Sequence, residues 1–375
     1  MIYFLPLESY TERYTFQQSG PGGWFESYWR KEGVKFTRIS LWDRTSSIKQ
    51  GAIVDYCKRA EQSFYQVRSI LHKIERGEIG QKDVIYFDDF WTPGVEQIAY
   101  ALSFVPEENR PRMYGFCYAQ SPDEFDFTAK LMSKWIGWFE KGIAQILDGV
   151  FVASTLLKDL LEKSWGKHNY HVVGLPFNSN EVRSLMPSAL STDREDTVLF
   201  TSRWDEEKNP RFFLEVAKKV QAKYPEAVFK ICTSAPNLRS NNPDLIDLLK
   251  SAQQTTNIQV MQGLSKAEYY RLLCESKVQV NTSLQDWISY TLLEASVAGA
   301  YPIYPRFRSF PEVFGDDSPH LYQPENSDEA SEKIVDVLRR NDLWTEGQIK
   351  EREWIHAKCD RTIEKITGVL LGESK

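Results

Sequence analysis

The chain has few cysteines, few histidines and no long apolar run. Its five cysteines are scattered among 375 residues, and none forms a Cys-x-x-Cys pair. This excludes a disulfide framework and a zinc cluster of the usual spacing, and it is typical of reduced cytoplasmic thiols. No stretch approaches the roughly 18 apolar residues of a membrane-spanning helix. The apolar run from Ile2 has no basic residues before it and is broken by Pro6 and Glu8. We therefore expect a cytoplasmic protein with no signal peptide and no membrane partner.

An excess of positive charge is also missing. The chain has 46 basic and 52 acidic residues, a net charge of −6. This argues against a protein whose whole surface coats nucleic acid. Basic and acidic residues nearly balance over residues 1–175, so most of the negative charge falls in the second half. A local basic groove in the first half is compatible with this distribution.

The length favours two domains, because one hydrophobic core rarely extends over 375 residues. Strand-like apolar runs alternate with helix-like amphipathic ones, a pattern that predicts parallel sheets covered by helices. In the first half the expected strands are 2–7, 34–41, 84–87, 112–119 and 149–153, and the expected helices are 24–31, 53–76, 95–104 and 126–147. The pattern then restarts with strands at 170–174, 197–201, 227–232, 258–261, 278–281 and 301–304.

The prediction is an α/β fold with two Rossmann-like domains. The first domain is placed at residues 1–175 and the second at 176–350, and a long helix within 351–375 is expected to cross back to the first domain. Ligands of such sheets bind beyond the carboxyl ends of the strands. The cleft between two such domains is therefore the expected active site.

Three segments at predicted strand ends suit a nucleotide diphosphate. Gly22 and Gly23 precede the first helix, where backbone N–H groups can approach a phosphate. Arg203 and Lys208 follow the strand at 197–201 and offer two cations to a diphosphate; as surface charges they would instead pair with the nearby acids. The loop after 278–281 holds Asp286, and the helix that follows holds Glu294. The backbone N–H groups at the start of that helix form a second anion site, made by Ser289, Tyr290 and Thr291.

Together these segments resemble the retaining glycosyltransferases of the GT-B fold, near the glycogen-synthase-like and sucrose-synthase-like group. The matching features are the Gly-Gly turn, Arg-x4-Lys, an acid-x7-Glu run, and the Ala-Ser-Val-Ala-Gly-Ala-Tyr-Pro that follows. The resemblance implies that the turn glycines contact the donor phosphate and sugar, that Arg203 and Lys208 bind the diphosphate, that Asp286 lies near the transferred sugar, and that Glu294 holds the ribose. It also places Gly263 and Leu264 beside the nucleotide base.

The resemblance has two departures and one mechanistic consequence. Asp286 stands where the family usually has Glu, and Ile288-Ser289 replaces the usual Phe-Gly, which leaves the donor sugar open between a hexose and a pentose. No Asp-x-Asp pair follows a strand of the second half, so we expect no metal and no cofactor beyond the donor, a UDP-sugar. The resemblance implies retention of anomeric configuration, with Arg203, Lys208 and helix dipoles neutralising the leaving diphosphate.

The acceptor is expected at strand ends of the first half, where acids stand beside aromatic residues. Such pairs suit activation of a hydroxyl and stacking on a ring; the plainer interpretation is helix caps and core aromatics. Lys130, Lys134 and Lys141 fall on one face of the predicted helix 126–147. We predict Asp89 and Asp123 as catalytic partners of Asp286. The predicted acceptor contacts are Arg13, Trp91, Gln120, Asp126, Lys130 and Lys134.

The segments 9–15 and 119–127 also resemble phage-type glycosyltransferases that act on hydroxymethylated pyrimidines in DNA. This resemblance implies transfer to a base hydroxymethyl group, with double-stranded DNA as the partner of a monomeric enzyme in the host cytoplasm. Such an enzyme reaches its base through a groove or by base flipping. Two alternatives stay open: a transferase for a polysaccharide or lipid-linked acceptor, and a sugar- or nucleotide-binding module without activity.

Overall fold

The computed structural model describes residues 1–7, 18, 20–41, 56–118, 120–187, 193–240 and 242–373. These residues form two compact units: unit 1 is Met1–Pro176 with Arg361–Lys375, and unit 2 is Phe177–Asp360. Within the described residues, no helix has the length and apolar character needed to cross a membrane.

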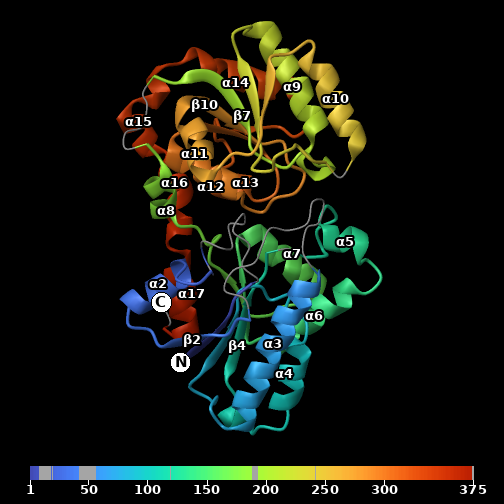
Figure 1. Cartoon of the computed structure of the whole chain (residues 1–375), viewed down its shortest axis with the longest axis vertical. Coiled ribbons are helices and arrows are strands. Elements are labelled where there is room, and N and C mark those ends of the chain that lie inside the picture. The colour runs from blue at the N-terminus through green and yellow to red at the C-terminus, as the bar shows by residue number, and fades with distance from the viewer. Residues whose placement is uncertain are drawn as a thin grey trace. The chain divides into compact units, whose positions relative to one another are not determined.

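Unit 1 is a six-stranded parallel sheet with helices on both faces (Figure 1). The strand order is β2-β1-β3-β4-β5-β6. Its strands are β1 (Ile2–Leu5), β2 (Phe36–Arg38), β3 (Val84–Phe87), β4 (Arg112–Phe116), β5 (Gly149–Val152) and β6 (Tyr170–Val172). Its described helices are α2 (Trp24–Lys31), α3 (Tyr56–Glu75), α4 (Val95–Leu102), α5 (Phe127–Leu131), α6 (Ile136–Ile146), α7 (Thr155–Trp165) and α17 (Thr362–Leu371), with a 3₁₀ turn at Glu107–Asn109.

Unit 2 is a second six-stranded parallel sheet, in the order β12-β11-β10-β7-β8-β9. Its strands are β7 (Glu195–Phe200), β8 (Val228–Cys232), β9 (Ile258–Met261), β10 (Ser276–Val280), β11 (Tyr301–Pro305) and β12 (Leu321–Tyr322). Its helices include α8 (Ser179–Leu185), α9 (Pro210–Lys223), α10 (Pro243–Gln253), α11 (Lys266–Glu275), α12 (Tyr290–Ala298), α13 (Phe310–Phe314), α14 (Ser327–Arg339), α15 (Glu346–Glu351) and α16 (Trp354–Asp360); 3₁₀ turns occupy Glu206–Lys208 and Asp342–Trp344. The predicted fold class of two Rossmann-like α/β halves is thus confirmed.

The core of unit 1 is strongly aromatic. Phe4, Phe25, Trp29 and Tyr86 form one buried cluster, in which the rings of Phe4 and Trp29 meet edge to face with centroids 5.2 Å apart. This cluster accounts for part of the aromatic residues of the sequence, which make up 13% of the chain, and edge-to-face packing is favourable between such rings.

The C-terminal segment differs from the single long helix that the sequence predicts. The chain forms α15, α16 and α17 in succession, and only Arg361–Lys375 belongs to unit 1. The break lies at Arg361, because the next residue is fixed elsewhere: the Thr362 hydroxyl lies 3.0 Å from the Val173 carbonyl and 3.2 Å from that of Leu175. Helix α17 then lies beside α2 (Figure 1), and Trp29 donates to the Thr367 hydroxyl at 2.9 Å.

A second predicted helix, 126–147, is also divided in two, so Lys130, Lys134 and Lys141 do not share one helix face as predicted: they lie on α5, in the turn and on α6. Helix α5 ends at Leu131 and α6 begins at Ile136. In the turn between them the Met132 carbonyl accepts from both Trp135 and Ile136. The turn lets the Trp135 ring pack against Trp91, with centroids 6.2 Å apart, a tertiary contact that helical periodicity alone does not show.

Candidate functional site

Two of the donor candidates, Lys208 and Asp286, meet at one point of the unit 2 sheet. Strands β7 and β10 are neighbours, yet the chain passes through β8 and β9 on one side before it returns to β10 on the other. Such a reversal leaves a crevice beyond the carboxyl ends of the two strands, where α/β sheets bind ligands. Lys208 follows β7, and Asp286 follows β10.

Lys208 contacts the loop that holds Asp286. Its ammonium lies 2.8 Å from Asp286 Oδ1, and it also donates to the Gln285 carbonyl and the Ser283 hydroxyl, each at 3.3 Å. The Lys208 side chain is 10% exposed and that of Asp286 is 21% exposed. The structure therefore brings together two residues that are far apart in the sequence and that were both predicted for the donor site.

The turn that presents Lys208 has a local explanation. The next residue, Asn209, adopts a left-handed conformation with φ of 50°, and its side chain accepts from Phe212 N as the cap of α9. Pro210 takes the first helical position, where its missing N–H is not needed. Thr282 fixes this turn to the opposite loop, since its hydroxyl donates to the Lys208 carbonyl at 2.7 Å.

Arg203 pairs with neighbouring acids in the structure, whereas the sequence predicts that it binds the diphosphate. Its guanidinium lies 2.6 Å from Glu207 and 3.5 Å from Asp205, and its side chain is 56% exposed. This is the ion pairing with nearby acids that the sequence offered as the alternative. A diphosphate contact would require Arg203 to exchange these carboxylates for phosphate oxygens.

The start of α12 stands close to the same strand ends. Ser289 is its cap residue, with an extended backbone, and its hydroxyl lies 2.8 Å from that of Thr291; Tyr290 is the first helical residue. One turn further on, the Glu294 carboxylate accepts from the Tyr270 hydroxyl at 3.0 Å. Burial raises the pKa of Glu294, while nearby Lys266 and the hydrogen bond from Tyr270 oppose the rise.

Gly263 and Leu264 lie between β9 and α11. Gly263 has a φ of +67°, a conformation that favours glycine, and its N–H donates to the Ala235 carbonyl at 2.8 Å. Leu264 N donates to the Thr233 carbonyl at 3.3 Å. Backbone hydrogen bonds therefore join the loops after β8 and β9 at this edge of the unit 2 sheet.

Arg308 is a residue of this region that the sequence reasoning missed. Its guanidinium stacks over the Trp287 ring at 4.6 Å, and its Nε donates to the Leu284 carbonyl at 3.3 Å. Both partners lie in the loop of Asp286. An Arg after a strand was a weak signal, because the stacking partner stands about twenty residues earlier in the sequence.

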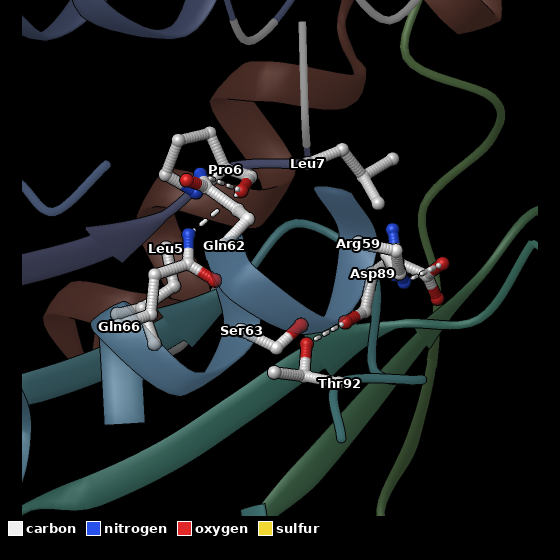
Figure 2. A pocket seen from close by; sticks show the side chains of 9 residues that line it. All are labelled: Leu5, Pro6, Leu7, Arg59, Gln62, Ser63, Gln66, Asp89 and Thr92. Atoms are coloured by element: carbon white, nitrogen blue, oxygen red, sulfur yellow. Dashed lines mark hydrogen bonds and ion pairs between the residues drawn. The ribbon is translucent and has the colours of Figure 1, made fainter. Parts of the chain in front are cut away.

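Unit 1 has a small polar pocket at its own reversal of strand order, beyond the ends of β1 and β3 (Figure 2). Asp89 lines this pocket, and its Oδ2 lies 2.9 Å from the Arg59 guanidinium. Arg59 also donates to the Trp91 carbonyl at 2.8 Å. Gln66 reaches across to the Pro6 carbonyl at 2.8 Å. Asp89 is therefore ion-paired where the sequence predicts a catalytic carboxylate.

The Gly-Gly turn lies before α2. Gly22 adopts a φ of +70°, and its N–H donates to the Glu26 carboxylate at 3.3 Å. Glu26 also accepts from Arg30 at 2.6 Å and from Arg38 at 3.1 Å. The following residue, Gly23, is the cap of α2 and has no side chain to close it. In this structure a carboxylate takes the Gly22 amide that the resemblance assigns to a donor phosphate.

The second acceptor segment is held by its own polar groups. Asp126 accepts from Thr128 N at 2.8 Å as the cap of α5, which is the plainer interpretation. Gln120 and Asp123 are almost fully buried; Gln120 accepts from the Cys117 thiol, and Asp123 accepts from Phe125 N at 3.0 Å. The geometry thus places all three residues in the framework of the loop.

The centre of this framework is Glu140, which the sequence reasoning did not single out. Its fully buried carboxylate accepts from Ser121 N at 3.0 and 3.1 Å and from the Ser121 hydroxyl. Burial raises the pKa of Glu140 to about 7, against the opposing hydrogen bonds from Ser121. The sequence held no signal for it beyond an acid in a largely apolar helix.

The remaining acceptor candidates differ in how far the structure describes them. Lys130 and Lys134 are exposed, and Lys130 lies over the Phe125 ring at 5.8 Å. Trp91 packs on Trp135 and Phe139. Arg13 lies outside the described residues.

A comparison with known protein families finds a match within unit 2. Residues 182–354, just under half of the chain, match the family described as "Glycosyl transferases group 1". The matched segment resembles the group 1 glycosyl transferases, and we call it the group 1 domain. This match supports the coarser part of the prediction, a glycosyltransferase of group 1, for the part of the chain that contains Arg203, Lys208, Asp286 and Glu294.

Individual proteins share the fold of the group 1 domain and of unit 1. Sucrose-phosphate synthase of Thermosynechococcus elongatus is 12% identical, with a TM-score of 0.65 over 98% of this chain and 97% of its own. TarM of S. aureus, in a complex with fondaparinux, alpha-GlcNAc-glycerol and UDP, is 18% identical, with a TM-score of 0.58 over 81% of this chain and 59% of its own. At these identities the likeness shows the GT-B fold alone.

Curated relatives also match this chain in sequence, and one of them is named for a tRNA nucleoside. The tRNA-queuosine alpha-mannosyltransferase of Drosophila melanogaster is 20% identical over 144 residues, which are 38% of this chain and 36% of the relative. The match therefore spans about a third of that protein's length.

Proposed function

We propose that the chain is a glycosyltransferase that moves a sugar from a nucleoside diphosphate sugar, a UDP-sugar, to the hydroxymethyl group of a modified pyrimidine in DNA. The observation that supports the transferase most is the contact of Lys208 with Asp286 at the reversal of strand order in the group 1 domain. The support for a nucleic-acid acceptor is the resemblance to phage-type enzymes, together with a relative named for a tRNA nucleoside.

In this proposal the residues of unit 2 bind the donor. Lys208 neutralises the diphosphate as it leaves, and Arg203 joins it after exchanging its carboxylate partners. The N–H groups at the start of α12 receive phosphate oxygens, and Glu294 accepts from the ribose hydroxyls. Asp286, held by Lys208, lies beside the transferred sugar. Gly263 and Leu264 line the base.

The retaining step follows from the family resemblance. The acceptor oxygen bonds to the anomeric carbon on the face from which the diphosphate departs, the bond from that carbon to the phosphate oxygen breaks, and the hydroxyl proton passes to the departing oxygen. The chain supplies two cations near that oxygen, Arg203 and Lys208, and the reaction is proposed to need no metal. In unit 1, Asp89 and Trp91 are proposed to contact the acceptor, while Gln120, Asp123 and Asp126 shape its loop.

The test measures acceptor and sugar together. Purified protein is incubated with hydroxymethylated or unmodified duplex DNA and a panel of nucleotide sugars, and the digested nucleosides are weighed. We expect one added sugar on the hydroxymethylpyrimidine nucleoside, and none on unmodified DNA. Transfer RNA forms a parallel arm: a mass gain on its nucleosides alone would replace DNA as the acceptor. No gain in any arm contradicts the proposal.

Arg308 is expected to tune donor binding through the Asp286 loop. Arg308→Ala removes the stack on Trp287 and the hydrogen bond to Leu284, contacts worth about 1 kcal/mol together when partly exposed. We expect the KM for the donor to rise about fivefold, with a smaller change in kcat. Arg308→Lys keeps the charge but lacks the planar stack, so it should resemble Arg308→Ala. An unchanged KM in both variants would show that the loop is held without Arg308.

A further inference from the structure

Large apolar side chains are exposed on α5, on α6 and in the turn between them. Leu131 is 76% exposed, Trp138 is 87% exposed and Trp135 is 49% exposed. Such residues are usually buried, so a group of them exposed in one stretch of chain indicates a binding surface. Trp138 and Gly142 stand four residues apart in α6, which places them along one face of that helix, and Trp135 is the cap residue just before it.

The exposed charges of the same stretch all have one sign. Residues 127–147 contain three lysines and a single acid, Glu140. The three lysines are exposed, whereas the Glu140 carboxylate is fully buried against Ser121. The nearest exposed acids, Glu124 and Asp148, stand outside this stretch at either end. The exposed residues of α5, the turn and α6 therefore carry three positive charges and no negative one, in a chain whose net charge is negative, and this favours an anionic partner. We call this region the α5–α6 surface, made by Lys130, Leu131, Lys134, Trp135, Trp138 and Lys141.

The α5–α6 surface continues into the region proposed for the acceptor. The Trp135 ring packs on Trp91, and both rings pack on Phe139. The Trp91 backbone is in turn held by Asp89 and Arg59 at the polar pocket of unit 1. Packed aromatic rings thus connect Trp135 of this surface to Trp91, which lies beside that pocket.

We propose that the α5–α6 surface binds nucleic acid. Lys130, Lys134 and Lys141 contact backbone phosphates, and the open indole of Trp138 stacks on an unpaired base. A bilayer fits less well, because Lys141 stands on the same helical stripe as Trp138, whereas helices that lie in a membrane keep a broad apolar face clear of charge. The proposal rests on the proposed function only in taking a nucleic acid as the acceptor.

Binding of unmodified DNA, measured without donor, tests the surface separately from sugar transfer. Fluorescence anisotropy with a labelled single strand and a labelled duplex is followed across about 50 to 200 mM salt. The triple variant K130Q/K134Q/K141Q should bind both about tenfold more weakly at low salt, and its salt slope should fall by about 2.7 if each lysine meets one phosphate of a duplex. Trp138→Ala should lose about tenfold on the single strand, and Trp138→Phe should restore most of it.

Two matched controls come from unit 1. The variant K31Q/K82Q/K163Q removes the same charge from exposed positions elsewhere, and Phe104→Ala removes another exposed ring, which is 74% exposed on the segment after α4. Both should bind DNA like the unchanged protein. Equal losses in test and control variants would overturn the proposal, as would binding to phosphatidylserine vesicles in place of DNA. If sugar transfer fails in every arm while these binding losses appear, the proposed function falls and the binding surface stands.

Discussion

Replacing Lys208 by methionine is expected to lower sugar transfer about 100- to 1000-fold, the range seen when one group that stabilises a developing charge is removed. The ammonium is held between Asp286, Gln285 and Ser283. Methionine keeps most of the length and apolar volume but offers no charge to the leaving diphosphate. It also leaves the Asp286 carboxylate without its cation, so kcat should fall and the KM for the donor should rise.

The control for this loss is Lys218→Met, an exposed lysine on α9 in the same unit. Its transfer rate should match that of the unchanged protein. Lys208→Arg should recover part of the activity, because it restores a cation although not its exact position. Thermal unfolding of each variant separates loss of chemistry from loss of fold. A folded Lys208→Met protein with full activity would remove Lys208 from the mechanism.

The Glu140 carboxyl is expected to make the protein less stable as the pH rises. Its pKa is raised from 4.5 to about 7 by burial. Between these two values the unfolded chain releases the proton while the folded chain keeps it, so the free energy of unfolding falls through this range and levels off above pH 7. The full cost is about 3 kcal/mol. Glu140→Gln removes the ionisation and keeps an oxygen for Ser121.

Urea unfolding at several pH values between 4.5 and 8 checks this expectation. The stability difference between Glu140→Gln and the unchanged protein should grow in favour of the variant by about 3 kcal/mol over the range. Glu124→Gln changes an exposed carboxyl near the same loop, and its curve should run parallel to that of the unchanged protein. Parallel curves for Glu140→Gln as well would mean that the buried group does not hold its proton.

Much of the fold was readable because strands and helices here obey local rules. The run Val84–Phe87 is apolar throughout and forms a fully buried strand, and Asn209-Pro210 starts a helix as a cap followed by a first-turn proline should. The contact of Lys208 with Asp286 was foreseeable for a related reason: both follow parallel strands, whose carboxyl ends meet at one edge.

What escaped prediction depends on contacts that no local pattern contains. The division between α5 and α6 follows from a ring packing on Trp91, and the end of α16 follows from carbonyls in the segment after β6. The partners of Asp89 and Arg203 were also open, because an acid at a strand end serves equally for catalysis and for pairing with an arginine. Glu140 was overlooked since its burial arises only when Ser121 folds over it.

The path of the chain through unit 1 has a consequence for synthesis. Helix α17 contributes Ile363, Ile366 and Leu370 to the same core as Phe4 and Trp29. A ribosome adding about 5 to 20 residues per second needs roughly 10 to 40 seconds to pass from the end of β6 to this helix. During that time unit 1 lacks α17, so the apolar side chains that this helix covers stay exposed. Unit 2 is continuous in sequence, and all of its segments are made before α17. The order of folding is then expected to reverse the order of translation, and α17 is the piece that closes the molecule last.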